Sequence, residues 1–153
     1  MTLKRKIAVI ADILLMIATL CFIWGNSMLT KTQSSTGSSK VFEKFKPIFD
    51  VILGEGVITH SIFRKMTHFS EFALLGIEVF VLHALLCKIK PINVIFALLY
   101  GLGVAGIDEI IQIFSNRGPS IIDVLIDFWG FSTAVLVLTL FTLIIRKIRK
   151  RKS

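Results

Sequence analysis

The polar residues between positions 108 and 127 are the part of this sequence whose residue types and spacing allow chemistry. The stretch carries four carboxylates, one amide and one guanidinium, on Asp108, Glu109, Asp123, Asp127, Gln112 and Arg117. It lies between two apolar runs that are each long enough to cross a bilayer. Ionisable side chains at such a place are expensive and usually face a bundle interior or a cavity. The pattern therefore predicts a polar site on one side of a membrane, and it names neither a ligand nor a reaction.

Three stretches place polar residues on one side of a helix, because their members recur three or four positions apart. The first holds Arg64, His68, Glu71, Leu75 and Glu78, the second Gly101, Ala105, Asp108 and Gln112, and the third Asp123, Asp127, Gly130 and Ala134. Each polar face continues into small or apolar residues, which is typical of a bundle interior. Gly101, Gly103, Ala105 and Gly106 are small enough to let membrane helices approach closely.

The composition indicates which elements hold these faces. Of the 153 residues, 54% are hydrophobic and 18% are charged, and the mean hydropathy is +0.80. Soluble domains are roughly 45–50% apolar with about 25% charge. The sequence therefore predicts one all-α integral membrane domain over residues 1–153, a bundle of four transmembrane helices. The apolar runs place these helices at about residues 7–29, 66–87, 92–114 and 121–145, followed by a basic cytoplasmic tail at 146–153.

Residues 30–63 form the long first loop of this arrangement, and its parts differ in composition. Residues 30–39 are polar and rich in Ser and Thr, which is typical of a flexible linker. Over residues 41–53, apolar side chains recur at helical spacing among charged ones, and Pro47 suits the first position of a helix. This pattern predicts a short amphipathic helix lying on the bilayer surface. The alternative is an ordinary loop packed on the bundle.

Positive charges predict the orientation in the cell membrane. If both termini are cytoplasmic, 11 of the 18 Lys and Arg residues lie on the inner side, as the positive-inside rule requires. Glu71, Asp108 and Asp127 then lie on the order of 8–10 Å below the outer interface. We expect a polar pocket that opens outward, with Arg64, Lys65 and Arg117 at its rim and carboxylates and His68 at its floor. The basic tail lacks the interleaved aromatic or polar side chains that would contact bases, so no nucleic-acid partner is expected.

Three groups of residues carry a resemblance to the VanZ-like family: Arg64-Lys65-x-x-His68-Phe69-x-Glu71-Phe72, Asp108-Glu109-x-x-Gln112-x-Phe114 and Arg117-x5-Asp123-x3-Asp127-x2-Gly130. The resemblance covers nearly the whole chain and implies four membrane helices with the longer loop after the first. It departs from the family pattern at Ser115-Asn116, where relatives often have Pro-Gly. The family's namesake is associated with low-level resistance to the lipoglycopeptide teicoplanin. The resemblance thus implies a bacterial cell-envelope membrane protein and supplies no reaction.

One function that fits these residues is a binding module that works in the lipid bilayer. Its basic rim would hold the headgroup of a phospholipid or of a lipid-linked cell-wall intermediate, or a lipoglycopeptide. The expected ligand-binding residues are Arg64, Lys65, His68, Glu71, Asp108, Glu109, Gln112, Arg117, Asp123 and Asp127.

Three alternatives stay open. An intramembrane enzyme acting on lipid or a cell-wall precursor would use an acid or base among His68, Glu71, Asp108 and Glu109. No cofactor is the main expectation, but a divalent cation held by His68, Glu71, Asp108, Glu109 and Asp127 would be Mg, Mn or Ca rather than Zn. A small transporter would use Glu78, deep in its helix, and would need a homodimer. Finally, the charges could simply pair as structural support.

Overall fold

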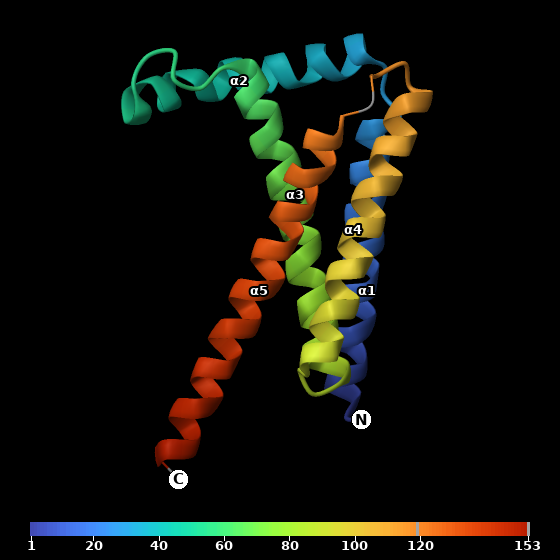
Figure 1. The fold of residues 1–153 in the computed structure, drawn as a ribbon, viewed down its shortest axis with the longest axis vertical. Coiled ribbons are helices and arrows are strands. Elements are labelled where there is room, and N and C mark those ends of the chain that lie inside the picture. The colour runs from blue at the N-terminus through green and yellow to red at the C-terminus, as the bar shows by residue number, and fades with distance from the viewer. Residues whose placement is uncertain (119, 153) are drawn as a thin grey trace.

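Five helices make up the part of the chain that the computed structural model describes, residues 1–118 and 120–152. They are α1 (Leu3–Ser27), α2 (Lys31–Leu53), α3 (His60–Leu86), α4 (Pro91–Phe114) and α5 (Ile121–Lys152) (Figure 1). Four of them, α1, α3, α4 and α5, are long and apolar enough to cross a membrane. The predicted all-α architecture with four membrane-spanning helices is therefore confirmed.

Two helices extend beyond the apolar runs that predict them. α3 begins at His60 rather than near residue 66, because the Thr59 hydroxyl accepts a hydrogen bond from the backbone N–H of Ile62. Such a cap satisfies one of the free N–H groups in the first turn. α5 continues through the basic tail to Lys152. As a result Arg64 lies within α3, one turn before His68.

α2 includes the segment expected to be a flexible linker, and this corrects the expectation for residues 30–39. Thr30 and Gln33 form a reciprocal capping box that starts the helix, and three hydroxyls in the following turns donate to backbone carbonyls of the same helix. Pro47 lies inside α2 rather than at its start. The helix lies across one end of the bundle (Figure 1), and none of its residues is fully buried. Its contact with a bilayer surface stays a prediction.

α3 and α5 cross in close contact at two glycines. A Cβ placed on Gly130 would lie 2.2 Å from the carbonyl oxygen of Phe69, and one placed on Gly76 would lie 2.5 Å from that of Phe131. Only glycine leaves room for backbone at these positions, which is how small residues act in membrane bundles. The crossing brings the polar faces of α3 and α5 together.

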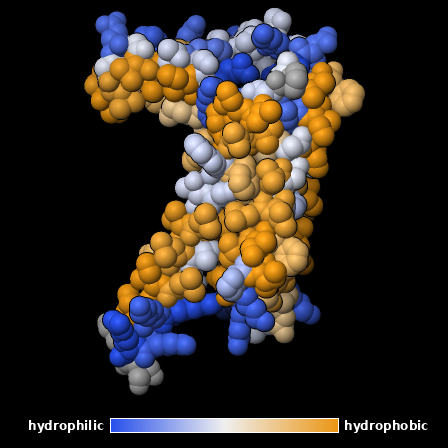
Figure 2. All heavy atoms as spheres, in the orientation of Figure 1, coloured by the Kyte–Doolittle hydropathy of each residue, from blue (hydrophilic) through white to orange (hydrophobic). Residues whose placement is uncertain are grey.

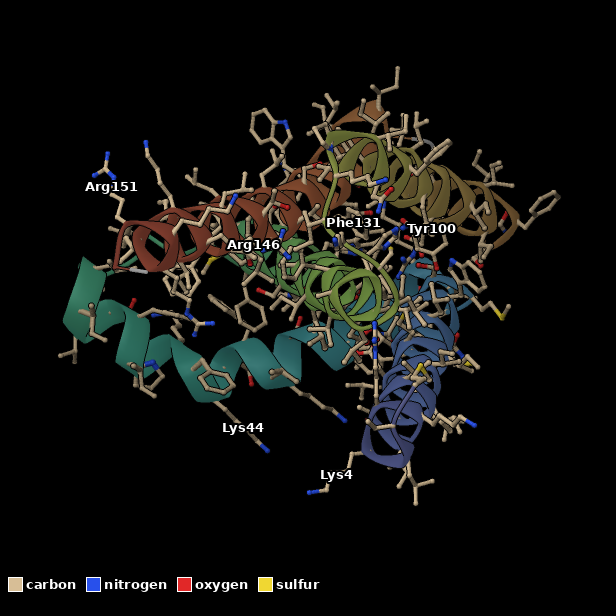
Figure 3. All side chains as sticks on the ribbon, turned by 90° about the horizontal axis from the view of Figure 1, so that it is seen from below. Lys4, Lys44, Tyr100, Phe131, Arg146 and Arg151 are labelled. Carbon is tan, nitrogen blue, oxygen red and sulfur yellow. The ribbon has the colours of Figure 1, made fainter. Side chains whose placement is uncertain are left out.

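α4 packs onto this pair through Gly101, whose backbone lies against the Phe131 ring. That ring is fully buried, and its centroid lies 6.3 Å from the centroid of Tyr100 (Figure 3). Of the small residues expected to bring α4 close to a neighbour, Gly101 does so. Gly103 and Gly106 have no described atom of another segment near the position of an added Cβ.

On the face seen in Figure 2, hydrophobic residues cover the long helices and one side of α2, and hydrophilic residues gather toward the two ends of the molecule. Many large apolar side chains in the four long helices are exposed, among them Ile10, Leu14, Phe96 and Leu140. Contiguous apolar surface of this kind marks contact with a membrane. α1 starts and α5 ends at the same end of the bundle, opposite α2 (Figure 1). The chain is thus a multi-pass membrane protein.

Candidate functional site

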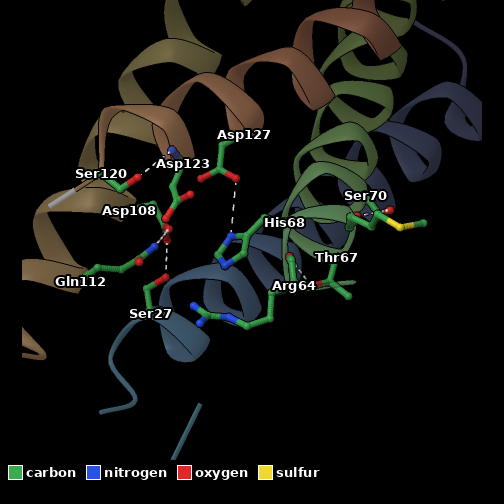
Figure 4. A network of polar contacts seen from close by, with 11 residues as sticks. Ser27, Arg64, Thr67, His68, Ser70, Asp108, Gln112, Ser120, Asp123 and Asp127 are labelled. Carbon is green, nitrogen blue, oxygen red and sulfur yellow. Dashed lines mark hydrogen bonds and ion pairs between the residues drawn. The ribbon is translucent and has the colours of Figure 1, made fainter. Parts of the chain in front are cut away.

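The three polar faces meet near the α2 end of the bundle (Figure 4). α3 brings Arg64 and His68 to this place, α4 brings Asp108, and α5 brings Asp127. Asp108 is 0% exposed and Asp127 is 1% exposed. Residues that are far apart in the sequence therefore form one group, in which the two carboxylates are buried and Arg64 and His68 are partly buried.

Asp108 is held at the centre of this group by two hydrogen bonds. Ser27 Oγ donates to Oδ1 at 2.7 Å, and Gln112 Nε2 donates to Oδ2 at 2.7 Å. Gln112 lies one turn after Asp108, as the spacing predicts. Sequence reasoning misses Ser27 as a site residue, because it belongs to none of the three polar faces. Its only signal is that a polar pair, Asn26-Ser27, closes the first apolar run.

His68 and Asp127 face each other across the α3–α5 crossing. His68 Nδ1 lies 3.5 Å from Asp127 Oδ1, which is longer than a good hydrogen bond. His68, Asp108 and Asp127 each offer an atom that lies within 4.8 Å of the others. We call these three residues the central cluster. One imidazole and two carboxylates from three helices thus converge on a small volume.

A cavity of about 410 Å³, here the main cavity, opens beside the central cluster between α1, α2 and α3. Its charged and titratable lining residues are Arg64, His68, Glu71 and Arg117. Its large apolar lining residues are Phe22, Leu29, Val41 and Phe63. A second cavity of about 90 Å³ lies on the other side of Arg64 and His68 and is lined also by Lys65 and Asp123. The lining of the main cavity therefore combines charged residues with large apolar ones and with polar residues of α1, α2 and α3.

Arg117 reaches the main cavity from the turn between α4 and α5. Its backbone N–H donates to the Gln112 carbonyl at 3.1 Å, and Asn116 has a φ of 57°, which reverses the chain at this point. Arg117 is 8% exposed, and its Nε and Nη2 have no hydrogen-bond partner among the described residues. Burial and the neighbouring Arg64 cation lower the pKa of Arg117. Arg64 and Arg117, which are both positively charged, therefore line the same cavity.

A family model described as VanZ/LLP1 matches residues 11–142. This range covers most of the chain and contains the central cluster and all the lining residues of both cavities. The chain belongs to the VanZ/LLP1 family. The resemblance drawn from the motifs is therefore confirmed. Comparisons with curated proteins and with solved structures found no significant match.

Two predicted site residues of this VanZ/LLP1 protein stabilise the turn between α4 and α5. The Glu109 carboxylate accepts a hydrogen bond from the backbone N–H of Ser120. The Ser120 hydroxyl in turn accepts one from the backbone N–H of Asp123 at 3.2 Å, which caps the start of α5. Glu109 lines neither cavity, whereas Asp123 also lines the smaller one. The Glu109 carboxylate of α4 thus stabilises the turn that carries Arg117.

Pairing of arginine with carboxylate, one of the alternatives for these charges, is not found in the site. Within residues 1–118 and 120–152, the only ion pair of the site within 4.0 Å is that of His68 with Asp127. Glu78 lies apart from the site: Thr19 Oγ1 donates to its Oε1 at 2.8 Å, and it lines neither cavity. Among the described residues, the guanidinium groups of Arg64 and Arg117 therefore have no ion-pair partner within 4.0 Å, and two carboxylates converge beside them.

Proposed function

We propose that this VanZ/LLP1 protein binds the phosphate-bearing headgroup of a membrane lipid in the main cavity, with Arg64 and Arg117 contacting the phosphate. The observation that carries this proposal is the buried guanidinium of Arg117. Two of its nitrogens have no hydrogen-bond partner among the described residues, and a second arginine, Arg64, lies beside it. A buried cation without a partner is strongly unfavourable. A phosphate would offer acceptor oxygens to both side chains, in a geometry that the planar guanidinium matches.

The apolar lining residues of the main cavity fit the acyl chain of such a lipid. Phe22 from α1, Leu29 from the connection between α1 and α2, Val41 from α2 and Phe63 from α3 line the same space as the two arginines. Ligand cavities in proteins are commonly about 300–1,000 Å³ and mostly apolar, with a few polar groups that orient the ligand. A volume of about 410 Å³ suits a headgroup and the first part of an acyl chain, while the remaining chain stays in the bilayer.

The positive-inside rule supports an orientation in which both termini are cytoplasmic and the main cavity faces outward. In that orientation the ligand is an outer-leaflet phospholipid or a lipid-linked cell-wall headgroup. Binding either of them changes what a lipoglycopeptide meets at the cell surface. Low-level protection against teicoplanin-type drugs in the cell envelope would follow from this binding without any turnover.

Native mass spectrometry tests the proposal directly. The full chain is purified in detergent and titrated with phosphatidylglycerol, and the fraction of protein that retains one lipid is measured. We expect Arg64→Gln and Arg117→Gln each to weaken retention roughly tenfold or more, since each removes charge-assisted hydrogen bonds. The matched control is Lys44→Gln, which removes one positive charge from the exposed face of α2, where Lys44 points away from the bundle (Figure 3).

Retention that falls in both arginine variants and not in the control supports the proposal. Lipid attracted only by the basic end of α5 would be lost in none of the three variants. The proposal fails if both arginine variants retain phosphatidylglycerol as the wild type does.

A further inference from the structure

The central cluster has a composition that the lipid-binding proposal does not use. We propose that His68, Asp108 and Asp127 together bind one divalent cation of the Mn²⁺ or Mg²⁺ class in the interior of the bundle. The three residues come from α3, α4 and α5, and each offers a ligand atom within 4.8 Å of the others. The inference stands on this geometry and does not depend on which lipid the main cavity holds.

The charges of the central cluster are unbalanced. Asp108 and Asp127 are both fully buried, and among the described residues the only positive partner that either has within 4.0 Å is His68. The Oδ1 atom of Asp127 is buried and has no hydrogen-bond donor among the described residues. Buried carboxylates need a counter-charge or donors, because they have lost their water. A divalent cation between them would supply that charge to both carboxylates at once.

Asp108 is oriented in the way that metal-ligating carboxylates are. Its two oxygens accept hydrogen bonds from Ser27 Oγ and Gln112 Nε2, both at 2.7 Å, and each oxygen keeps a further lone pair. Carboxylates that ligate metals are typically held by hydrogen bonds of this kind, which fix their direction. Ser27 and Gln112 are therefore positioning residues for the ligand Asp108.

The ligand types and spacing indicate the class of cation. One imidazole with carboxylate oxygens suits hard ions such as Mg²⁺, Mn²⁺ and Ca²⁺ better than zinc. Ligands on opposite sides of Mg²⁺ are about 4.2 Å apart, and on opposite sides of Ca²⁺ about 4.6–5.2 Å. The observed limit of 4.8 Å lies within this span, so small side-chain movements bring the atoms to ligand distance. Mn²⁺ accepts both oxygen and imidazole ligands and is the informative probe.

The main cavity gives the cation access and room for water ligands. His68 belongs both to the central cluster and to the lining of the main cavity, and Glu71 lines the cavity one turn further along α3. Both residues therefore border the space through which an ion can enter. Water or a ligand oxygen in the main cavity can fill coordination positions that the protein leaves open beside His68.

Electron paramagnetic resonance of Mn²⁺ tests the inference on the full chain in detergent after treatment with a chelator. Binding removes the signal of free aqueous Mn²⁺, and we expect one ion per chain. His68→Gln and Asp127→Asn should each lower the affinity roughly tenfold or more. Glu78→Gln is the matched control: it removes another buried carboxylate of α3, outside the central cluster, and should leave Mn²⁺ binding unchanged.

Thermal unfolding distinguishes a lost site from a damaged fold. Mn²⁺ should raise the melting temperature of the wild type and of Glu78→Gln, because it binds only the folded state, and not that of His68→Gln or Asp127→Asn. Arg117→Gln should still bind Mn²⁺, so the cation site and the lipid site can fail separately. The inference is overturned if the wild type binds no Mn²⁺ up to about 1 mM, the weak end for protein sites, or if both cluster variants bind as the wild type does.

Discussion

Replacing Gly130 with alanine should push α3 and α5 apart and thereby open the central cluster. The added Cβ would lie 2.2 Å from the carbonyl oxygen of Phe69, whereas ordinary contacts begin at 3.4 Å. The two helices must therefore separate by about 1.2 Å along this line, the difference between the two distances. Phe69 directly follows His68, and Asp127 precedes Gly130 by one turn. The same movement therefore lengthens the 3.5 Å contact between His68 and Asp127.

The size of the effect follows from the clash and from the helix preference of alanine. Forcing an extra methyl group into a packed contact costs about 1–3 kcal/mol, and a gap of about 0.5–1 Å loses a quarter to a half of the dispersion energy of each contact across it. Alanine is favoured over glycine in a helix by up to about 1 kcal/mol. Gly103→Ala isolates this second effect, because nothing lies within 4 Å of its added Cβ. We therefore expect Gly130→Ala to be less stable than Gly103→Ala by about 1–3 kcal/mol.

The free energy of unfolding of both variants can be measured by titrating the detergent-solubilised protein with sodium dodecyl sulfate and following circular dichroism. Mn²⁺ and phosphatidylglycerol binding are then measured under conditions in which both variants are folded. Gly130→Ala should bind both probes more weakly than Gly103→Ala. If the two variants have the same stability and the same binding, the close α3–α5 crossing does not position the site and the reasoning is refuted.

Three further predictions follow from the site. Ser27→Ala should lower stability by about 0.6 kcal/mol, the average for a polar contact in membrane bundles, and should weaken Mn²⁺ binding roughly tenfold by freeing Asp108; wild-type values for both would contradict its positioning role. In intact cells, a membrane-impermeant maleimide should label the variant Lys44→Cys and spare Cys87, and the reverse pattern would contradict the orientation. At matched membrane levels, wild-type protein should raise the inhibitory concentration of teicoplanin and Arg117→Gln should not. If the wild type has no effect, drug protection is not part of this protein's function.

Helical periodicity predicts the elements of the site better than it predicts their contacts. The spacing of Arg64, His68 and Glu71 on one helix, and of Asp108 and Gln112 on another, places each set on one face, and the structure keeps them there. The distance between His68 and Asp127 depends on how closely α3 and α5 cross. That crossing depends on glycines packing against backbone, which periodicity does not describe.

The parts that the sequence does not predict are those set by individual hydrogen bonds. The Ser- and Thr-rich residues 30–39 resemble a linker by composition, yet a capping box and hydroxyl-to-carbonyl bonds let them continue as helix. Ser27 stands alone at the end of α1, so no spacing reveals its bond to Asp108. Glu109 is predicted as a ligand residue because it belongs to the polar stretch between positions 108 and 127, and no spacing predicts that its carboxylate accepts a hydrogen bond from the backbone of Ser120.

The most direct test of the central claim is to map where a photoreactive phosphatidylglycerol analogue attaches to the full chain in native membranes. The reactive group of the analogue lies near the start of the acyl chain. Peptide mass spectrometry should therefore find cross-links at the apolar lining residues of the main cavity, which are Phe22, Leu29, Val41 and Phe63. These cross-links should disappear in Arg117→Gln and persist in Lys44→Gln. Cross-links confined to the outer surfaces of α4 and α5, and equal in all three proteins, would contradict a lipid-binding cavity between α1, α2 and α3.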